Sequence, residues 1–299
     1  MSKAKLRSAM YSINEMTKKI NGYSYASKAD MRVMLTRCIK DLHQLGFKLS
    51  HIKGLKPKHI HALVDQWQSQ DKSTGTIKNY MSKLRKAVLI LDKPKLVKSD
   101  NEAYNISNRS YTPTNNKAIH QIDFDKCKDT LIRLSIEAQA LFGLRREESM
   151  KMVLSEALQG GHLNIKPSWT KGGVGRILEI STDEQRQWIN KALQVIPNGK
   201  SLIPKERSYK QHLRHYQKQT ELMGVSKLHG LRHAYAQRRY FELTQKHDPL
   251  GIGWQCPING GKQRNELTVQ ERIIDKRVRL IISNELGHSR ISITKIYCG

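Results

Sequence analysis

The sequence lacks the features that define several common classes of protein. Its few cysteines are far apart and form no C-x-x-C pair, which argues against a disulfide framework or a thiolate zinc site; they are Cys38, Cys127, Cys256 and Cys298. No apolar run approaches the roughly 20 residues that span a bilayer. The basic N-terminus is not followed by the apolar stretch of a signal peptide. We therefore expect a cytoplasmic protein with no membrane partner.

Acidic residues are also scarce, with 26 Asp and Glu against 53 Lys and Arg, for a formal net charge of +27. Such an imbalance strains the compact state by self-repulsion and favours a polyanionic partner. Nucleic acid is the expected partner, and the alternatives are an anionic membrane or no partner. Residues 1–100 alone carry 21 Lys and Arg against 7 Asp and Glu. This part should therefore bind backbone phosphates by itself, with an affinity that falls steeply with salt.

The first 100 residues have the apolar spacing of helices. One helix is predicted between a cap at Ser27 and a stop at Gly46, a second from Pro57, and a third after Ser73. One face of the third helix is basic. We expect that face to contact DNA, and a solvated helix surface is the alternative; its residues are Lys78, Lys83, Arg85 and Lys86.

Residues 101–121 are polar and have no periodicity, which predicts a linker between a domain of residues 1–100 and one of residues 122–299. The second domain opens with a predicted helix over 128–142. Residues 163–166 and 176–180, joined by a glycine-rich turn, predict a β-hairpin. Thr182 is a good cap for the next helix. The expected fold class is mainly α with a small β-hairpin or sheet (α+β).

Four segments of the second domain carry groups that could cut a phosphodiester. The reaction needs an activated nucleophile, fixed cations for the charge on the phosphorane, and a proton for the leaving oxygen. Arginine suits the second task because its planar fork grips two phosphate oxygens. Taken singly, each of these residues is more often an ordinary surface or packing residue. In chain order the groups are Arg145, Lys171 at the hairpin tip, His229 with Arg232, and His288 nine residues before Tyr297.

The ordered set resembles the tyrosine recombinase (phage integrase) family. The family boxes G-L-R-x-x-E, H-x-L-R-H and L-G-H followed by tyrosine match residues 143–148, 229–233 and 286–297. The stretch S-T-x-T-I-x-N-Y at residues 73–80 also looks like the core-binding domain of that family. The resemblance implies an N-terminal helical core-binding domain that binds DNA and a C-terminal tyrosine recombinase catalytic domain.

The resemblance also implies the roles of the site residues. Tyr297 would attack the scissile phosphate and form a 3′-phosphotyrosyl link, which conserves the bond energy. Arg145 and Arg232 would hold the non-bridging oxygens, and His288 would donate a further hydrogen bond to them.

Three further roles follow from the same resemblance. Lys171 would protonate the leaving 5′-oxygen, His229 would handle the tyrosine proton, and Glu148 would orient the active-site helices without touching DNA. No metal ion and no cofactor are expected, which agrees with the absence of a Walker loop or a zinc motif from the sequence.

The implied function is a site-specific recombinase that integrates or excises a mobile element. Its partners would be double-stranded DNA at specific attachment sites, a homotetramer on that DNA, and accessory DNA-bending proteins, in association with the nucleoid. A type IB topoisomerase and a non-catalytic DNA-binding accessory protein are the alternatives. His229 and the separate N-terminal bundle favour the recombinase. A carboxylate-triad transposase would need clustered acidic residues and Mg²⁺.

One departure from the family pattern concerns the spacing of its boxes. Arg232 and His288 are 56 residues apart, longer than is usual for the family. The extra material, an insertion at about residues 244–270, is expected to be an exposed loop that contacts DNA or a neighbouring subunit. A zinc site formed by Cys256 and His247 is not expected, since two more ligands are not evident.

Overall fold

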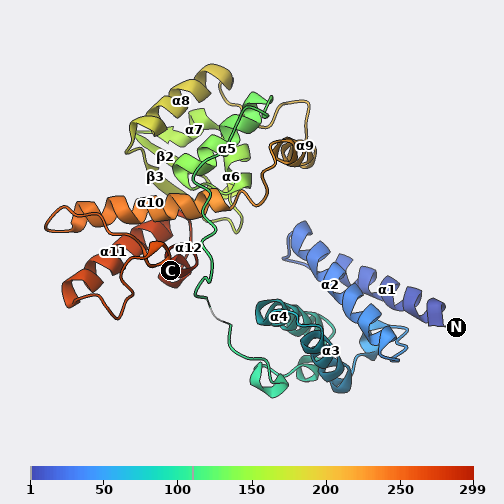
Figure 1. The fold of residues 1–299 in the computed structure, drawn as a ribbon. Helices are drawn as coiled ribbons and strands as arrows, with labels where there is room; N and C mark the ends of the chain where they lie inside the picture. The colour runs from blue at the N-terminus through green and yellow to red at the C-terminus, as the bar shows by residue number, and fades with distance from the viewer. Residues whose placement is uncertain (1, 110) are drawn as a thin grey trace. The chain divides into compact units, whose positions relative to one another are not determined.

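The computed structural model describes residues 2–109 and 111–299, which form two units, residues 1–110 and residues 111–299. The first unit is helical (Figure 1). Its helices are α1 (Ser2–Lys18), α2 (Tyr25–Gln44), α3 (Pro57–Ser69) and α4 (Thr74–Ile90). Their apolar faces enclose one core, in which the indole of Trp67 is fully buried and donates to Asp41 Oδ2 over 3.1 Å.

The predicted starts of two of these helices are confirmed, and a third is corrected. Pro57 is the first residue of α3, and Ser73 caps α4 by accepting the N–H of Thr76. The cap of α2 is Ser24, because its Oγ accepts the N–H of Ser27 over 3.2 Å. Ser27 therefore lies within the first turn. The periodicity of the sequence did not predict α1.

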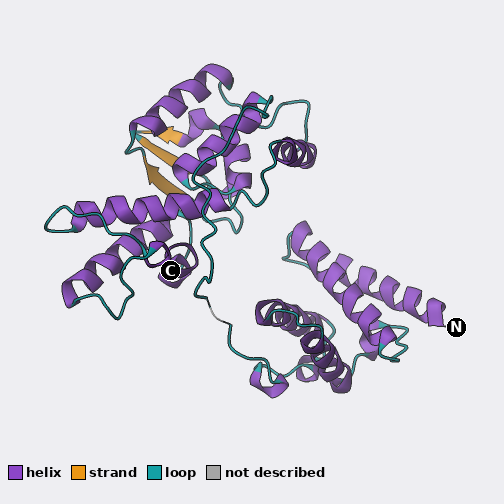
Figure 2. Ribbon diagram, viewed as in Figure 1, coloured by secondary structure: helices purple, strands orange, loops and turns teal. Residues whose placement is uncertain are grey.

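The second unit surrounds a small sheet. Helices α5 (Thr130–Phe142), α6 (Arg146–Lys151) and α7 (Leu154–Ala157) precede it, and α8 (Asp183–Val195) and α9 (Tyr209–Leu222) follow it. The unit ends with α10 (Gly230–His247), α11 (Val269–Glu285) and α12 (Lys295–Cys298). Figure 2 shows the sheet flanked by helices. The expected fold class, mainly α with a small sheet, is confirmed.

The predicted hairpin is present and has a third strand. Strands β1 (Leu158–Gln159), β2 (His162–Ile165) and β3 (Arg176–Glu179) are antiparallel in the order β1-β2-β3. Leu163 pairs with Leu178, and both side chains are buried. The two-residue strand β1 is too short to give an alternating pattern, so the sequence did not predict it.

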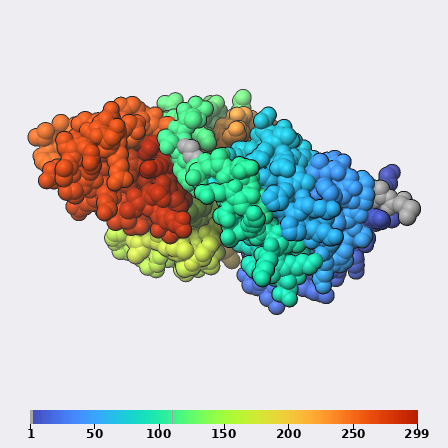
Figure 3. Space-filling view, turned by 90° about the horizontal axis from the view of Figure 1, so that it is seen from below, coloured from blue at the N-terminus to red at the C-terminus, as the bar shows by residue number. Residues whose placement is uncertain are grey.

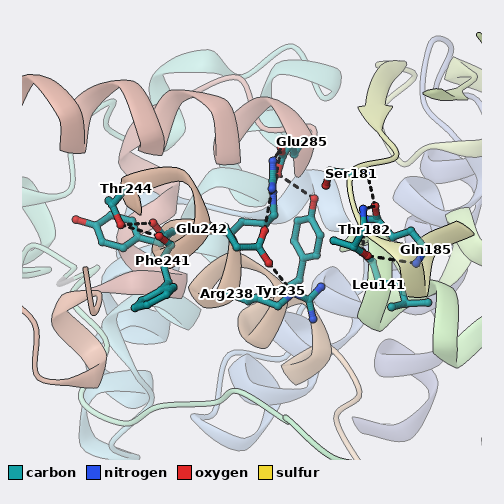
Figure 4. A network of polar contacts seen from close by, with 12 residues as sticks. Leu141, Ser181, Thr182, Gln185, Tyr235, Arg238, Phe241, Glu242, Thr244 and Glu285 are labelled. Atoms are coloured by element: carbon teal, nitrogen blue, oxygen red, sulfur yellow. Dashed lines mark hydrogen bonds and ion pairs between the residues drawn. The ribbon is translucent and has the colours of Figure 1, made fainter. Parts of the chain in front are cut away.

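Thr182 caps α8, as predicted, and Gln185 completes the cap. The Oε1 of Gln185 accepts the N–H groups of Ser181 and Thr182, and its Nε2 donates to the main-chain oxygen of Leu141 over 2.9 Å (Figure 4). The start of α8 is thereby fixed to the end of α5. This contact fixes the C-terminal end of α5, which leads into the turn at residue 143.

The stretch predicted as a linker divides between the two units. Tyr104 lies in a 3-10 helix and is buried in the core of the first unit. Ile119 donates its N–H to the main-chain oxygen of Gly230 over 3.0 Å in the second unit. A substantial part of residues 101–121 is therefore folded onto one unit or the other.

The insertion is only partly the exposed loop that we expected. Leu250 is 80% exposed, but the N–H of Trp254 donates to Thr244 Oγ1 and its indole donates to Asp248 Oδ2. Cys256 is 1% exposed and shares an apolar cluster with α12. The expected exposure is therefore wrong at Cys256, because apolar residues of this stretch pack against the C-terminal helix. The expected contact with DNA or a neighbouring subunit stays a prediction. In Figure 3 part of the dark-red C-terminal segment is visible beside the orange-red segments of its own unit.

Two kinds of feature are absent from the described residues. No group of three or more His, Cys, Asp or Glu side chains there could hold a metal ion. No helix in residues 2–109 or 111–299 is long and apolar enough to cross a membrane.

Candidate active site

The first box forms a sharp turn between α5 and α6. Gly143 ends α5 in the left-handed conformation, with φ at +60°, where a side chain would be strained. A Cβ atom at Gly143 would also lie 2.5 Å from the ring of Tyr235 on α10. The turn therefore requires glycine for two reasons, and it places Arg145 at the N-cap of α6.

Arg145 and Glu148 form a closed pair at the start of α6. The main-chain N–H of Arg145 donates to Glu148 Oε2 over 2.8 Å, and its Nη1 donates to Oε1 over 2.6 Å. Glu148 is fully buried, whereas the Arg145 side chain remains 24% exposed. The carboxylate thus holds the guanidinium from the protein interior.

Arg176, at the start of β3, belongs to the same cluster, and sequence reasoning missed it. Its Nη2 donates to Glu148 Oε2 over 2.7 Å, and its Nε donates to the main-chain oxygen of Glu285 over 2.6 Å. Burial acts to raise the pKa of Glu148, but the hydrogen bond and charge of Arg176, followed by those of Arg145, lower it to about 2. No local pattern could have found Arg176, because its partners are distant in the chain.

Arg232, in the first turn of α10, is almost wholly buried. Its Nη1 donates to the main-chain oxygen of Gly143 and its Nη2 to that of Leu286, so two of the boxes meet on one guanidinium. Burial lowers the pKa of Arg232 to about 10, which leaves the group charged at neutral pH. Its Nε lies 3.4 Å from the hydroxyl of Tyr297.

The hydroxyl of Tyr297 lies where the second and third boxes converge. Besides Arg232, it contacts Nε2 of His288 at 3.1 Å and Nε2 of His229 at 3.5 Å. Gln237 on α10 donates to the main-chain oxygen of Tyr297 over 2.9 Å. The tyrosine is only 4% exposed. The structure therefore fixes both the backbone of α12 and the phenol oxygen.

The histidines around Tyr297 favour their neutral forms. Burial, and then the charges of Arg232 and Arg145, lower the pKa of His288 to about 4. Burial and the same two arginines lower the pKa of His229 as well. A neutral imidazole has one ring nitrogen that can accept a proton and one that can donate a hydrogen bond. Both histidines can therefore exchange a proton or a hydrogen bond with the phenol.

A cavity of about 570 Å³ lies beside this cluster. Its wall includes Lys171, which lies in the exposed turn between β2 and β3, together with Arg145 and His229. Tyr209 and Tyr216 on α9 line it as well, with Arg146 placed 5.8 Å from the centre of the Tyr216 ring. The cavity thus presents cations to any group that enters it.

A buried ionic network of Tyr235, Arg239 and Glu285 lies next to the cluster of candidate site residues. The hydroxyl of Tyr235 donates to Glu285 Oε2 over 2.9 Å, and the two side chains point toward each other in Figure 4. Arg239 donates to both carboxylate oxygens of Glu285 and to Glu242 Oε2. The network joins α10, which carries Arg232, to the end of α11, which precedes His288. The two helices are thereby held together.

Two family models match the sequence. One described as phage integrase, N-terminal, matches residues 4–97, and one described as integrase matches residues 103–238. The chain belongs to the phage integrase family. The match in this integrase spans Arg145, Lys171, His229 and Arg232 but ends before His288 and Tyr297. The inclusion of His288 and Tyr297 in the candidate site therefore rests on the contacts around the Tyr297 hydroxyl and not on the family model.

Solved structures show that the integrase shares its fold with other tyrosine recombinases. A lambda integrase tetramer bound to a Holliday junction gives a TM-score of 0.52 at 15% identity, over 86% of this chain and 78% of that one. The Tn1549 transposon integrase with transposon right end DNA gives 0.52 at 10%, over 97% and 94%. The XerH recombinase in a post-cleavage complex gives 0.50 at 16%, over 98% and 90%. A comparison with curated proteins gave no match.

The basic residues predicted on α4 have partners within the first unit of the integrase. Lys83 pairs with Asp30 at 2.7 Å, Lys78 donates to Asn108 Oδ1, and Lys86 lies 6.0 Å from the centre of the Tyr23 ring. Arg85 donates to the main-chain oxygens of residues 98 and 100 and to the side chain of residue 101. Arg85 thus fastens the segment after α4, and the DNA contact expected for this face stays a prediction.

Proposed function

We propose that this enzyme cleaves and rejoins duplex DNA through a covalent link between Tyr297 and a 3′-phosphate. The observation that carries the proposal is the convergence of Arg232, His288 and His229 on the hydroxyl of Tyr297, at 3.4, 3.1 and 3.5 Å. A phenol held by one cation and two neutral imidazoles can be deprotonated without a long rearrangement. Packing alone does not explain three polar contacts to one buried hydroxyl.

The cleavage step can be written from these groups. The phenol oxygen of Tyr297 attacks phosphorus and its proton passes to His229, while the bond to the 5′-oxygen breaks. Lys171, on the cavity wall, donates a proton to that oxygen. One covalent bond to phosphorus forms as another breaks, so the reverse attack by a 5′-hydroxyl rejoins a strand without an external energy source.

Arg145, Arg232 and His288 carry the electrostatic part of the reaction. The charge that develops on the non-bridging oxygens is stabilised when donors are already fixed in place. Arg145 is suited to reach the phosphate, because Glu148 holds one side of its guanidinium while the side chain lines the cavity. In this proposal the arginines supply the charge stabilisation, so no metal ion or cofactor is required.

The partners follow from charge and fold. The proposed partner is double-stranded DNA at specific attachment sites. Residues 1–100 carry 21 Lys and Arg against 7 Asp and Glu, and they would bind the phosphates of that DNA. Strand exchange between two sites needs four active tyrosines, and we propose a homotetramer on DNA with accessory DNA-bending proteins. A lambda integrase tetramer on a Holliday junction has a similar fold. The proposed biological role is integration or excision of a mobile element.

The test uses nicked duplexes selected from a randomised pool for covalent retention by the protein. The nick lets the short cleaved strand diffuse away, which traps the intermediate. In EDTA, denaturing gels should show a protein–DNA species that survives boiling and disappears after protease treatment. The proposal predicts this species without added metal. A strict requirement for Mg²⁺, or no covalent species with any duplex, would contradict it.

A type IB topoisomerase would form a similar adduct, so a second assay separates the two functions. A recombinase should join strands between two plasmids that carry the selected site. A topoisomerase should relax supercoiled plasmids that lack the site and should not join strands between plasmids. The separate helical unit at the N-terminus favours the first result.

A further inference from the structure

Three arginine side chains converge on the C-terminal end of helix α11. Three successive carbonyl oxygens there each accept a hydrogen bond from a different guanidinium. Such carbonyls have no partner within the helix and carry the negative end of its dipole, so cations are favoured beside them. The pairs are Arg176 Nε with Glu285 at 2.6 Å, Arg232 Nη2 with Leu286, and Arg145 Nη2 with Gly287 at 3.3 Å.

Arg176 differs from the other two arginines in what it reaches. Arg145 lines the cavity and Arg232 contacts Tyr297, whereas the contacts of Arg176 are with Glu148 and the end of α11. Its side chain is 5% exposed, so it cannot meet DNA directly. The backbone also leaves room for it, because a Cβ atom at Gly287 would lie 3.2 Å from Arg176 Cδ and Nη1.

Glu148 is shared between Arg145 and Arg176. Oε1 accepts from Arg145 Nη1, whereas Oε2 accepts from both Arg176 Nη2 and the main-chain N–H of Arg145. With Arg176 absent, the full charge of this buried carboxylate would act on Arg145 alone. The guanidinium of Arg145 would then be drawn toward the interior, away from the cavity. The hydrogen bond from Arg176 on β3 to the main-chain oxygen of Glu285 at the end of α11 would be lost at the same time.

We propose that Arg176 is a positioning residue for strand cleavage, which acts through Glu148 on Arg145 and through the end of α11 on His288. It shares the charge of Glu148, so Arg145 stays turned toward the cavity. It also fixes Glu285, three residues before His288, and thereby the turn that presents His288 to Tyr297. This inference rests on the proposed function of the site.

The competing path runs along the hairpin. Arg176 is five residues after Lys171, so its loss could instead displace the lysine that protonates the leaving oxygen. The contacts favour the path through Glu148, because the hydrogen bonds of Arg176 reach α6 and α11. A chemical substitution in the DNA distinguishes the two paths. Sulfur in place of the bridging 5′-oxygen gives a leaving group that needs no protonation.

The experiment measures the rate of covalent adduct formation on a selected nicked duplex, made with oxygen or with sulfur at the bridging 5′ position. For Arg176→Met we expect the rate to fall by about 10- to 100-fold on both substrates, the range seen when a group that orients an active-site residue is lost. Lys171→Met should be slow on the oxygen substrate and close to wild type on the sulfur substrate. Arg186→Met, which removes an exposed arginine paired with Asp183, is the matched control and should leave both rates unchanged.

Two further variants keep the test decisive if Arg176→Met folds poorly. Arg176→Lys keeps the charge but can reach only Glu148 or the Glu285 carbonyl, so its rate should lie between those of wild type and Arg176→Met. In a Glu148→Gln background, Arg176→Lys should cost a smaller factor than in wild type, because the two residues act as a unit.

Each outcome bears on one claim. If sulfur restores the rate of Arg176→Met, the effect runs through Lys171 and the inference is wrong. Wild-type rates for both Arg176 variants would also overturn it, as would equal factors in the Glu148→Gln and wild-type backgrounds. If the wild-type protein forms no adduct on either substrate, the proposed function itself fails.

Discussion

The hydroxyl of Tyr297 lies 3.1 Å from Nε2 of His288, which is nine positions earlier in the chain. A 3-10 helix at residues 291–294 and the short helix α12 turn the chain back, and Thr294, the last residue of the 3-10 helix and the N-cap of α12, is buried. Ser283 stabilises this turn without contacting Tyr297. Its Oγ donates to the main-chain oxygen of Arg290 over 3.1 Å. The spacing of the third box therefore has a structural cause.

The Gly143 turn gives a prediction about stability. Gly143→Ala should destabilise the second unit by about 1–2 kcal/mol for the left-handed backbone and by a further 1–3 kcal/mol or so for the clash with Tyr235. Gly160 also has a positive φ, but nothing lies within 4 Å of its Cβ position. Gly160→Ala should cost only the first of these amounts. Urea unfolding of both variants tests the difference, and equal losses would show that the ring contact is unimportant.

His233 gives a prediction about pH. Burial, followed by the charges of His229, Lys117 and Arg232, lowers the pKa of His233 to about 4, below the ordinary value of 6.5. Between these values the unfolded chain binds a proton that the native protein does not. The stabilisation is therefore complete above pH 6.5 and is lost as the pH falls toward 4, by at most about 1.4 kcal/mol per pH unit.

His233→Gln removes that proton uptake. The free energy of unfolding of this variant should fall less than that of wild type between pH 7 and pH 5, as measured by denaturant titration at each pH. The same slope for both proteins would show that His233 titrates normally in the folded state.

The insertion gives a prediction about the tyrosine helix. Deletion of residues 250–266 should lower stability and adduct formation together, because Trp254 and Cys256 pack in the cluster that contains Tyr297. Leu250→Ser changes a side chain that is 80% exposed and should leave both unchanged. Thermal unfolding and the adduct assay provide the readouts. Full cleavage by a stable deletion variant would show that this packing does not support α12.

The basic face of α4 gives a prediction that separates folding from DNA binding. Arg85→Gln should lower the stability of the first unit, since three hydrogen bonds to residues 98–101 are lost. Lys86→Gln, at an exposed position, should leave stability unchanged and lower the salt dependence of DNA binding by about one phosphate contact. Binding titrations at several salt concentrations test this. An unchanged salt slope for Lys86→Gln would place that lysine away from DNA.

The sequence could predict the parts of the site that follow local rules. Helix periodicity located α3 and α4, glycines and alternation located β2 and β3, and the box spacings located the residues that meet at Tyr297. It could not predict Arg176, whose contacts depend on tertiary packing between β3, α6 and α11. It also could not show that Cys256 is buried against α12, because the long spacing between the second and third boxes predicted only an inserted, exposed loop there.

Tyr297 is the proposed nucleophile, and the covalent adduct tests this role directly. Tyr297→Phe keeps the ring and its packing but removes the attacking oxygen. The variant should bind the selected duplex with unchanged affinity and form no adduct in EDTA. Protease digestion of the wild-type adduct, followed by mass spectrometry, should place the nucleotide on the peptide that contains Tyr297. An undiminished adduct in Tyr297→Phe, or a nucleotide on another residue, would contradict the account.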